Sequence, residues 1–337
     1  MGHVVTSGAV VHDSFLDVGS EDPRFAFMEA IIALAEHDER IVALDADVSR
    51  RTLTRHFRDR FPDRFWDLGV AEQNLMGVTA GLAASGRIPV ACAFAVFVSM
   101  RAVEPIRTSI CYPRLNAKLV GGYAGLSNGK DGATHQSIED VAIMRSLPNL
   151  VVLSPSDAIL ADRIARAAIA HEGPVYVRME YEDTPRIHEP DVRFEIGRGI
   201  RVRTGSDLTL ATYGIALARA VEAARILGQA GISVEVLDMA SLKPFDEGLL
   251  VGSTDRTGAL VTLEDHSIIG GIASLAAETL LRAGRAPRFR ALGVADRFTE
   301  SGKNDELRAR FGLDVPAIVA AAREMLEDRV VTDGAMG

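Results

Sequence analysis

The chain has 337 residues, more than one hydrophobic core usually serves, so its length predicts two domains. Apolar residues make up 47% and charged residues 25%, as in ordinary globular proteins. The net charge of -9 disfavours a general surface for nucleic acid or anionic membranes, so an anionic substrate would need a local cluster of arginines. Two cysteines without metal-binding spacing, and the lack of a basic-then-apolar leader pattern, favour a cytoplasmic protein.

Strands and helices alternate through the first half of the chain. Residues 1–20 show no sustained periodicity, and we expect them to form a mobile N-terminal arm. Short apolar runs predict strands at 41–44, 65–68, 88–94, 117–121, 150–153 and 174–178. The stretches between them predict helices at 25–35, 52–57, 71–84, 100–112, 138–145 and 157–171. These elements define a first domain over residues 21–180.

A charged, proline-containing stretch follows, and we interpret residues 181–192 as a linker. A second domain is expected over residues 193–330. Its predicted strands are 208–212, 233–237 and 259–263, and its predicted helices are 215–230, 245–251, 269–282 and 315–327. Apolar strands that alternate with helices indicate parallel sheets covered on both faces, so the predicted fold class is α/β with two consecutive parallel-sheet domains.

Candidate site residues follow the expected strands of the first domain. Asp47, Glu72, Phe97 and Tyr123 each come shortly after a strand, and parallel sheets bind ligands at the carboxyl ends of their strands. Glu72 is either a carboxylate favoured by the helix dipole or a general acid/base. Phe94 and Phe97 are either core residues or a surface for a flat ring ligand.

A glycine-rich loop over residues 121–135 is the most informative local feature. It holds five glycines and has no apolar periodicity, and long loops within compact domains are usually functional. It is not a phosphate loop, because its glycine spacing is one residue too short and the Ser or Thr that would ligate magnesium is missing. Asp131, Thr134 and His135 together indicate a polar site. No feature of the sequence gives clear support for a metal ion held by this chain alone.

Taken together, these stretches resemble the transketolase family. The resemblance is carried by Leu68-Gly-Val-Ala-Glu72-Gln-Asn74, Ala93-Phe94-Ala-Val-Phe97, Gly129-Lys-Asp131-Gly-Ala-Thr-His135-Gln, Arg145-Ser-Leu-Pro-Asn149 and Glu264-Asp-His266-Ser-Ile-Ile-Gly-Gly271. It covers only the family's second half, the pyrimidine-binding domain and the C-terminal domain. The Gly-Asp-Gly motif of the family's first domain is absent, so the chain is similar to the C-terminal subunit of a split transketolase.

The resemblance implies an enzyme that transfers a two-carbon ketol unit from a sugar donor, ordinarily a sugar phosphate, to an aldose acceptor. It implies thiamine diphosphate as cofactor, with Mg²⁺ and the diphosphate held by a separate N-terminal subunit. It also implies homodimerisation of this chain within an α2β2 assembly. No nucleic acid or membrane partner is expected.

Matching positions in the family imply roles for the cofactor-binding residues. Glu72 would hydrogen-bond the pyrimidine ring of the cofactor and act in catalysis by favouring the imino tautomer, which takes the proton from the thiazolium carbon. Phe94 and Phe97 would line the face of that ring, and Asp47 would lie near the cofactor at the subunit interface. Met100 stands where the family often has a third aromatic residue, so this wall is thinner or softened by sulfur.

The resemblance also implies substrate-binding roles. Asp131 would bind a sugar hydroxyl, and His135 would bind the reacting end of the donor as a catalytic residue. Arg24 and Arg178 would hold the terminal phosphate, because a planar guanidinium binds oxyanions with two hydrogen bonds. Tyr123 departs from the histidine common at this position, so a sulfonate or a branched sugar phosphate is a possible alternative end group.

Three other functions fit parts of the same pattern. A deoxyxylulose-phosphate-synthase-like enzyme shares the Glu-Gln and Asp-Gly-x-Thr-His patterns, but should carry an arginine near Tyr123. A 2-oxo-acid dehydrogenase β-type subunit has the same two domains, yet should not keep the loop from Asp131 to His135 in this form. A non-catalytic assembly subunit would keep the fold, but retention of Glu72 argues against it.

Overall fold

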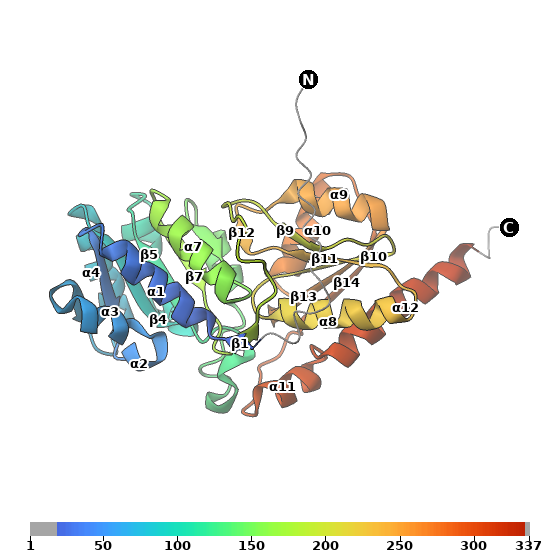
Figure 1. Ribbon diagram of the computed structural model, residues 1–337, viewed down its shortest axis with the longest axis horizontal. Coiled ribbons are helices and arrows are strands. Elements are labelled where there is room, and N and C mark those ends of the chain that lie inside the picture. The colour runs from blue at the N-terminus through green and yellow to red at the C-terminus, as the bar shows by residue number, and fades with distance from the viewer. Residues whose placement is uncertain (1–18, 334–337) are drawn as a thin grey trace, which may run out of the picture.

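Residues 19–333 of the chain are described by a computed structural model, in which two α/β units lie side by side (Figure 1). The arm expected over residues 1–20 lies outside the described residues except for its end. There Ser20 and Glu21 form β1 (Ser20–Glu21), which pairs with β8 (Thr184–Pro185) of the expected linker. Within residues 19–333, no helix is long and apolar enough to cross a membrane.

The first unit is built on a seven-stranded sheet. Its order is β12 (Ser241–Lys243), β6 (Val151–Leu153), β7 (Val175–Arg178), β5 (Lys118–Gly122), β4 (Ile88–Phe94), β2 (Ile41–Asp45) and β3 (Phe65–Asp67). All neighbouring pairs are parallel except β12 with β6. Strand β12 comes from the second half of the chain, so the two halves share this sheet.

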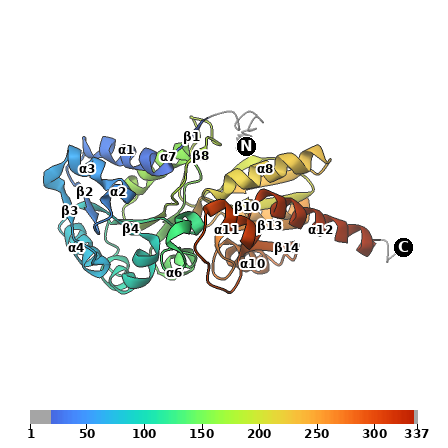
Figure 2. The same cartoon turned by 90° about the horizontal axis from the view of Figure 1, so that it is seen from below.

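Helices cover both faces of the first sheet because central strands such as β4 are apolar and buried on both sides. The helices of this unit are α1 (Pro23–Ala35), α2 (Ser49–Thr52), α3 (Thr54–Arg60), α4 (Glu72–Ala84), α5 (Val103–Pro105), α6 (Asp140–Ser146) and α7 (Ala158–Ala170). Figure 2 shows α1 and α7 on one face, and α4 and α6 on the other. Asp22 caps α1, with a proline in the first turn.

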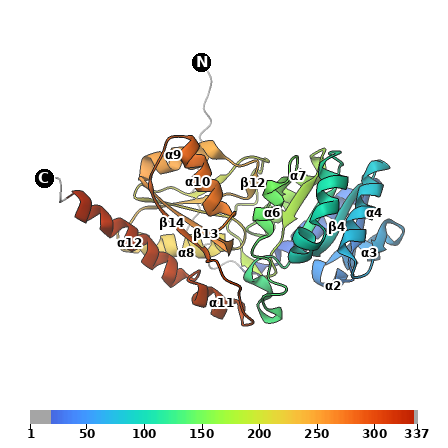
Figure 3. The ribbon, with the colours of Figure 1, turned by 180° about the vertical axis from the view of Figure 1, so that it is seen from behind.

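The second unit has a five-stranded sheet. Its order is β14 (Arg288–Val294), β13 (Ala259–Ser267), β10 (Leu208–Thr212), β11 (Val234–Asp238) and β9 (Ile200–Arg203), with only β9 antiparallel. Its helices are α8 (Ala216–Gln229), α9 (Glu247–Thr257), α10 (Ile272–Arg282), α11 (Asn304–Phe311) and α12 (Val315–Asp333). Figure 3 shows α9 and α10 above this sheet, and α8 and α12 below it. The predicted α/β class with two parallel-sheet units is confirmed.

Several elements differ from the sequence prediction. The helix expected at 52–57 is divided into α2 and α3 by Leu53, which has a left-handed backbone (φ 65°). The helix expected at 100–112 consists of π-helical turns, Phe97–Arg101 and Ile106–Cys111, around the short α5. The glycine-rich loop contains a 3-10 helix, η5 (Leu126–Asp131). Strands β9, β12 and β14 and helix α11 were not predicted, because edge strands carry polar residues and lack long apolar runs.

Candidate active site

The carboxyl ends of β2, β3, β4 and β5 meet at one edge of the first sheet, because these strands run parallel. Asp47, Glu72, Phe97 and Tyr123 follow these ends within a few residues. The expected juxtaposition of these four positions is therefore present. In Figure 1 this edge belongs to the first unit, the part of the molecule that contains α2, α4 and β4.

Glu72 is the first residue of α4, and its side chain is buried with 3% exposure. Its Oε2 atom lies 3.4 Å from Nη1 of Arg101, whose side chain is 54% exposed. The Arg101 guanidinium also lies 4.6 Å from the centre of the Phe97 ring. A buried carboxylate with a single long contact to an exposed arginine retains capacity for a further hydrogen bond.

The two phenylalanines form an aromatic surface beside Glu72. The Phe94 and Phe97 rings are stacked with centroids 6.2 Å apart. His135 meets both rings edge-on, 6.1 Å from Phe94 and 5.4 Å from Phe97, and its Nδ1 lies 2.9 Å from the Thr134 hydroxyl. The glycine-rich loop thus brings its histidine to the aromatic pair at the end of β4.

Tyr123 continues this surface toward a group of cationic side chains. Its ring stacks on Tyr181 at 4.2 Å and contacts Phe94 at 4.8 Å. Arg24 lies over Tyr181 at 4.0 Å, is largely buried, and is held by a salt bridge of 2.6 Å to Asp22. The side chain of Tyr123 therefore occupies part of this end of the site. The positive charge of Arg24 is already paired with the carboxylate of Asp22.

Arg51 is a candidate that the sequence prediction missed. It is exposed, and its Nη1 donates to the Tyr123 hydroxyl at 3.4 Å. The pKa of Arg51 is raised by this hydrogen bond and by the nearby negative charge of Asp131, an exposed residue at the end of η5. The only signal in the sequence was its place, six residues after the end of β2. Arg51 supplies an exposed positive charge at the Tyr123 end of the site.

A buried carboxylate fixes the turn that carries Arg51. Asp45, at the end of β2, accepts hydrogen bonds from the hydroxyls of Thr52 at 2.6 Å and Thr54 at 2.8 Å, and from the Val48 amide at 2.6 Å. Burial raises the pKa of Asp45 to about 6. Asp45 therefore has a structural position, anchoring α2 and α3 to the sheet.

Two of the expected site residues have left-handed backbones. Asp47 has φ 60° and Tyr123 has φ 59°. For tyrosine this conformation is unfavourable by about 1–3 kcal/mol, and such residues concentrate at functional sites. The Asp47 amide is held by the Asp67 carboxylate at 2.9 Å, and the Asp47 side chain is exposed.

Arg178 does not reach the site. It is fully buried between the two units, where Nη1 contacts Glu180 at 2.7 Å, Nη2 donates to the Asp265 carbonyl at 2.8 Å, and Nε lies 3.2 Å from Asp140. A guanidinium with its nitrogens engaged and no exposed surface cannot hold the terminal phosphate of a substrate in this arrangement. The expected phosphate contact of Arg178 is therefore corrected to a position in the core of the domain junction.

The residues at the edge of the first sheet fit one end of a flat heterocyclic cofactor. Phe94 and Phe97 offer an aromatic surface, and Glu72 offers a buried carboxylate for a ring nitrogen. Within residues 19–333, no group of three or more His, Cys, Asp or Glu side chains could hold a metal ion. The described residues at this edge therefore offer groups for a flat ring.

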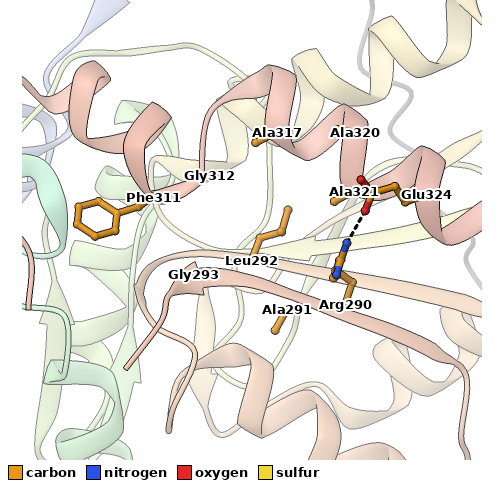
Figure 4. Close-up of a pocket in the computed structure, with 10 residues that line it drawn as sticks. All are labelled: Arg290, Ala291, Leu292, Gly293, Phe311, Gly312, Ala317, Ala320, Ala321 and Glu324. Carbon is orange, nitrogen blue, oxygen red and sulfur yellow. Dashed lines mark hydrogen bonds and ion pairs between the residues drawn. The ribbon is translucent and has the colours of Figure 1, made fainter. Parts of the chain in front are cut away.

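A separate cavity of about 370 Å³ lies in the second unit, between β14 and the helices α11 and α12 (Figure 4). Small apolar residues dominate its lining, and an ion pair between Arg290 and Glu324 (2.5 Å) lies at its edge. It contains none of the expected site residues.

Comparisons with known proteins agree with these observations. Residues 22–185 match the family model "Transketolase, pyrimidine binding domain", and residues 197–318 match "Transketolase, C-terminal domain". The chain is 43% identical to "Putative transketolase C-terminal section" of Methanocaldococcus jannaschii, covering 90% of this chain and 95% of that protein. It is 40% identical to "6-deoxy-6-sulfo-D-fructose transketolase subunit SqwH" of Clostridium sp. (strain MSTE9), covering 90% and 94%.

A solved structure described as "Split gene transketolase, inactive beta4 tetramer" has the same fold. Its TM-score is 0.84 at 46% identity, and the match covers 90% of this chain and 98% of that one. The similarity in sequence and in fold thus extends over both units.

Proposed function

Because this chain belongs to the transketolase family, whose members depend on thiamine diphosphate, we propose that it transfers a two-carbon ketol unit between sugars together with a separate N-terminal subunit. The observation that carries the proposal is the buried Glu72 carboxylate beside the Phe94–Phe97 pair, with His135 on the same aromatic surface. A chain kept only for assembly would have no need of this arrangement.

The chain's own residues have distinct tasks in the proposed reaction. Thiamine diphosphate, when bound, supplies the nucleophilic carbon that takes up the two-carbon unit. Glu72 holds a proton at the pyrimidine ring nitrogen, and Phe94 and Phe97 orient the ring and exclude water from it. His135 binds the carbonyl or hydroxyl end of the donor, and Asp131 binds a hydroxyl group farther along the sugar.

The rest of the active site is proposed to come from the N-terminal subunit. That subunit would hold Mg²⁺ and the diphosphate. The similarity to a "C-terminal section" and to a "split gene" transketolase supports this division. Pairing of two copies of this chain within an α2β2 assembly is the proposed architecture, with Asp47 near the subunit interface.

The end group of the sugar is proposed to be an oxyanion at Arg51 and Tyr123. Arg51 is an exposed cation whose Nη1 lies 3.4 Å from the Tyr123 hydroxyl, and Arg24 adds positive charge nearby. A phosphate is the first candidate. A sulfonate is the second, because a relative at 40% identity is named as a sulfo-sugar transketolase subunit.

Two measurements test the proposal. Mixed with the N-terminal subunit, thiamine diphosphate and Mg²⁺, the chain should transfer glycolaldehyde units from a ketose phosphate to an aldose, observed by mass spectrometry of the products. By titration calorimetry, the isolated chain should bind thiamine diphosphate far more weakly than the mixture does. Tight binding by the isolated chain would contradict the division of the site between two subunits.

A further inference from the structure

A segment of the second unit reaches across to the glycine-rich loop of the first. This segment, residues 299–304, comprises the end of the connection from β14 and Asn304, the first residue of α11. Figure 1 and Figure 2 both show α11 beside the part of the first unit that holds η5. The loop from η5 to His135 carries the two residues proposed to bind the donor sugar, so its contacts determine where those residues lie.

Both polar atoms of the Asn304 side-chain amide form hydrogen bonds with the main chain of η5. Its Oδ1 accepts from the Gly129 amide at 3.1 Å, and its Nδ2 donates to the Ser127 carbonyl at 3.3 Å. The Gly302 amide donates to the Gly129 carbonyl at 3.0 Å. Main-chain polar groups of Ser127 and Gly129 in η5 are therefore hydrogen-bonded to the second unit.

Gln136 provides the second attachment, immediately after His135. Its side chain is buried with 2% exposure and accepts a hydrogen bond from the Thr299 hydroxyl. Its Nε2 donates to the Glu300 carbonyl at 3.1 Å and to the Gly129 carbonyl at 3.3 Å. The two ends of the Asp131–His135 stretch are thus held by the same segment.

The glycines of the loop make this close approach possible. A Cβ atom at Gly129 would lie 2.5 Å from the Gly302 carbonyl oxygen and 2.6 Å from Oδ1 of Asn304. Gly132 has φ 75°, and a Cβ there would meet the Ser301 hydroxyl. The absence of side chains at these two positions is required by the segment of the second unit, and not only by the turns of the loop.

We propose that residues 299–304 position Asp131 and His135 for the donor sugar, with Thr299 and Asn304 as positioning residues. The inference rests on the proposed function, and it gives the C-terminal unit a task in donor binding. Without these contacts the main chain at Ser127 and Gly129 loses hydrogen-bond partners in the second unit, so the loop would open locally more readily. A displacement of about 1 Å in a positioning group is enough to reduce activity by about a hundredfold.

The test uses Thr299→Val and Asn304→Ala, with Thr299→Ser as the variant that keeps the hydroxyl. Glu306→Gln, an exposed position in the first turn of α11, is the matched control. Hydrogen exchange of residues 126–136 is measured by mass spectrometry on the full chain. The donor KM and kcat are measured on the chain mixed with its N-terminal subunit.

Thr299→Val and Asn304→Ala should exchange about tenfold faster in residues 126–136, as expected for the loss of a hydrogen bond. Their donor KM should rise about tenfold with a smaller change in kcat, while Thr299→Ser and Glu306→Gln behave as the wild type. Unchanged exchange in both loss variants overturns the proposal, as does faster exchange with an unchanged donor KM. If the wild-type mixture transfers nothing, the proposed function fails, and the exchange measurement still decides whether the segment holds the loop.

Discussion

Arg51 and Tyr123 show how two side chains set the chemistry at one end of the site. Tyr123 lies in a left-handed backbone conformation and stacks on Tyr181, and its hydroxyl accepts from Arg51. Arg24 is held by Asp22, whereas Arg51 is exposed beside Tyr123, so Arg51 is the cation that we expect an oxyanion to reach at this end of the site. The proposed selectivity for an anionic sugar therefore depends mainly on this one residue.

Replacing Arg51 with Met should raise KM for a ketose phosphate by about tenfold or more. A charge-assisted hydrogen bond contributes about 1.5–3 kcal/mol, which the variant loses. KM for an uncharged ketose should change little. The neighbouring Arg50→Met, also exposed, serves as the control. Equal effects on charged and uncharged donors would show that Arg51 does not bind the end group.

For single residues, the sequence predicted a position at the edge of the sheet when the residue lies close to the end of a predicted strand. Glu72, Phe94 and Phe97 lie at the expected edge, because the parallel pairing that places them follows from apolar runs. Arg178 also lies at a strand end, as the last residue of β7, but its strand position alone did not predict its contacts. Its burial depends on Asp265 of the second unit, to which no local pattern connects it.

At the scale of elements, the glycine-rich loop is shaped by contacts with distant segments. Gly125 has φ 62° and begins η5. A Cβ atom there would meet the Asp265 carbonyl oxygen and would lie 2.8 Å from Nη2 of Arg178. The sequence predicted a functional loop, but not that β13 and α11 of the second unit lie against it, because contacts distant in sequence leave no local periodicity.

Replacing Gly125 with Ala should lower the free energy of unfolding by about 2–5 kcal/mol, from backbone strain plus a clash with main-chain atoms. Gly258 has a similar φ of 68° but open space around it, so Gly258→Ala should cost only about 1 kcal/mol. Urea unfolding of both variants gives the comparison. Equal destabilisation would mean that the approach of β13 to Gly125 is not close.

At the scale of the whole molecule, the two units are held together by buried charges as well as by the shared sheet. His188 of the expected linker lies between Asp157 of the first unit and Asp238 of the second. Its Nδ1 is 3.1 Å from Asp157, and its Nε2 is 3.4 Å from Asp238. Burial alone would lower the pKa of His188, but the hydrogen bond and charge of Asp157, with the charge of Asp238, raise it above 6.5.

The raised pKa of His188 predicts a pH dependence of stability. The protonated histidine stabilises the folded chain fully below pH 6.5, and this contribution is lost as the pH rises through the folded-state pKa. The thermal midpoint of the wild type should therefore fall above pH 6.5 more steeply than that of His188→Gln. His37→Gln, an exposed position, should keep the wild-type slope. Parallel slopes for the wild type and His188→Gln would contradict this assignment.

The sequence, through its resemblance to the family's second half, led to the proposal that two chains share the active site. It gave no indication of how the two units of this chain join. The missing Gly-Asp-Gly motif indicated a partner. Strand β12, which joins the first sheet, and the segment 299–304 are both short polar stretches. Such stretches carry no recognisable sequence signal for secondary structure or packing. Long apolar elements define the units, and short irregular ones define their junction.

Glu72 is proposed to act in a transfer reaction completed by a second subunit, and one assay tests this role directly. The chain is mixed with the N-terminal subunit, thiamine diphosphate and Mg²⁺, and transfer from a ketose phosphate is followed for the wild type, Glu72→Gln and the exposed control Glu39→Gln. We expect activity in the wild type and the control, and a loss of about a hundredfold or more in kcat for Glu72→Gln. Undiminished turnover by Glu72→Gln would contradict the account.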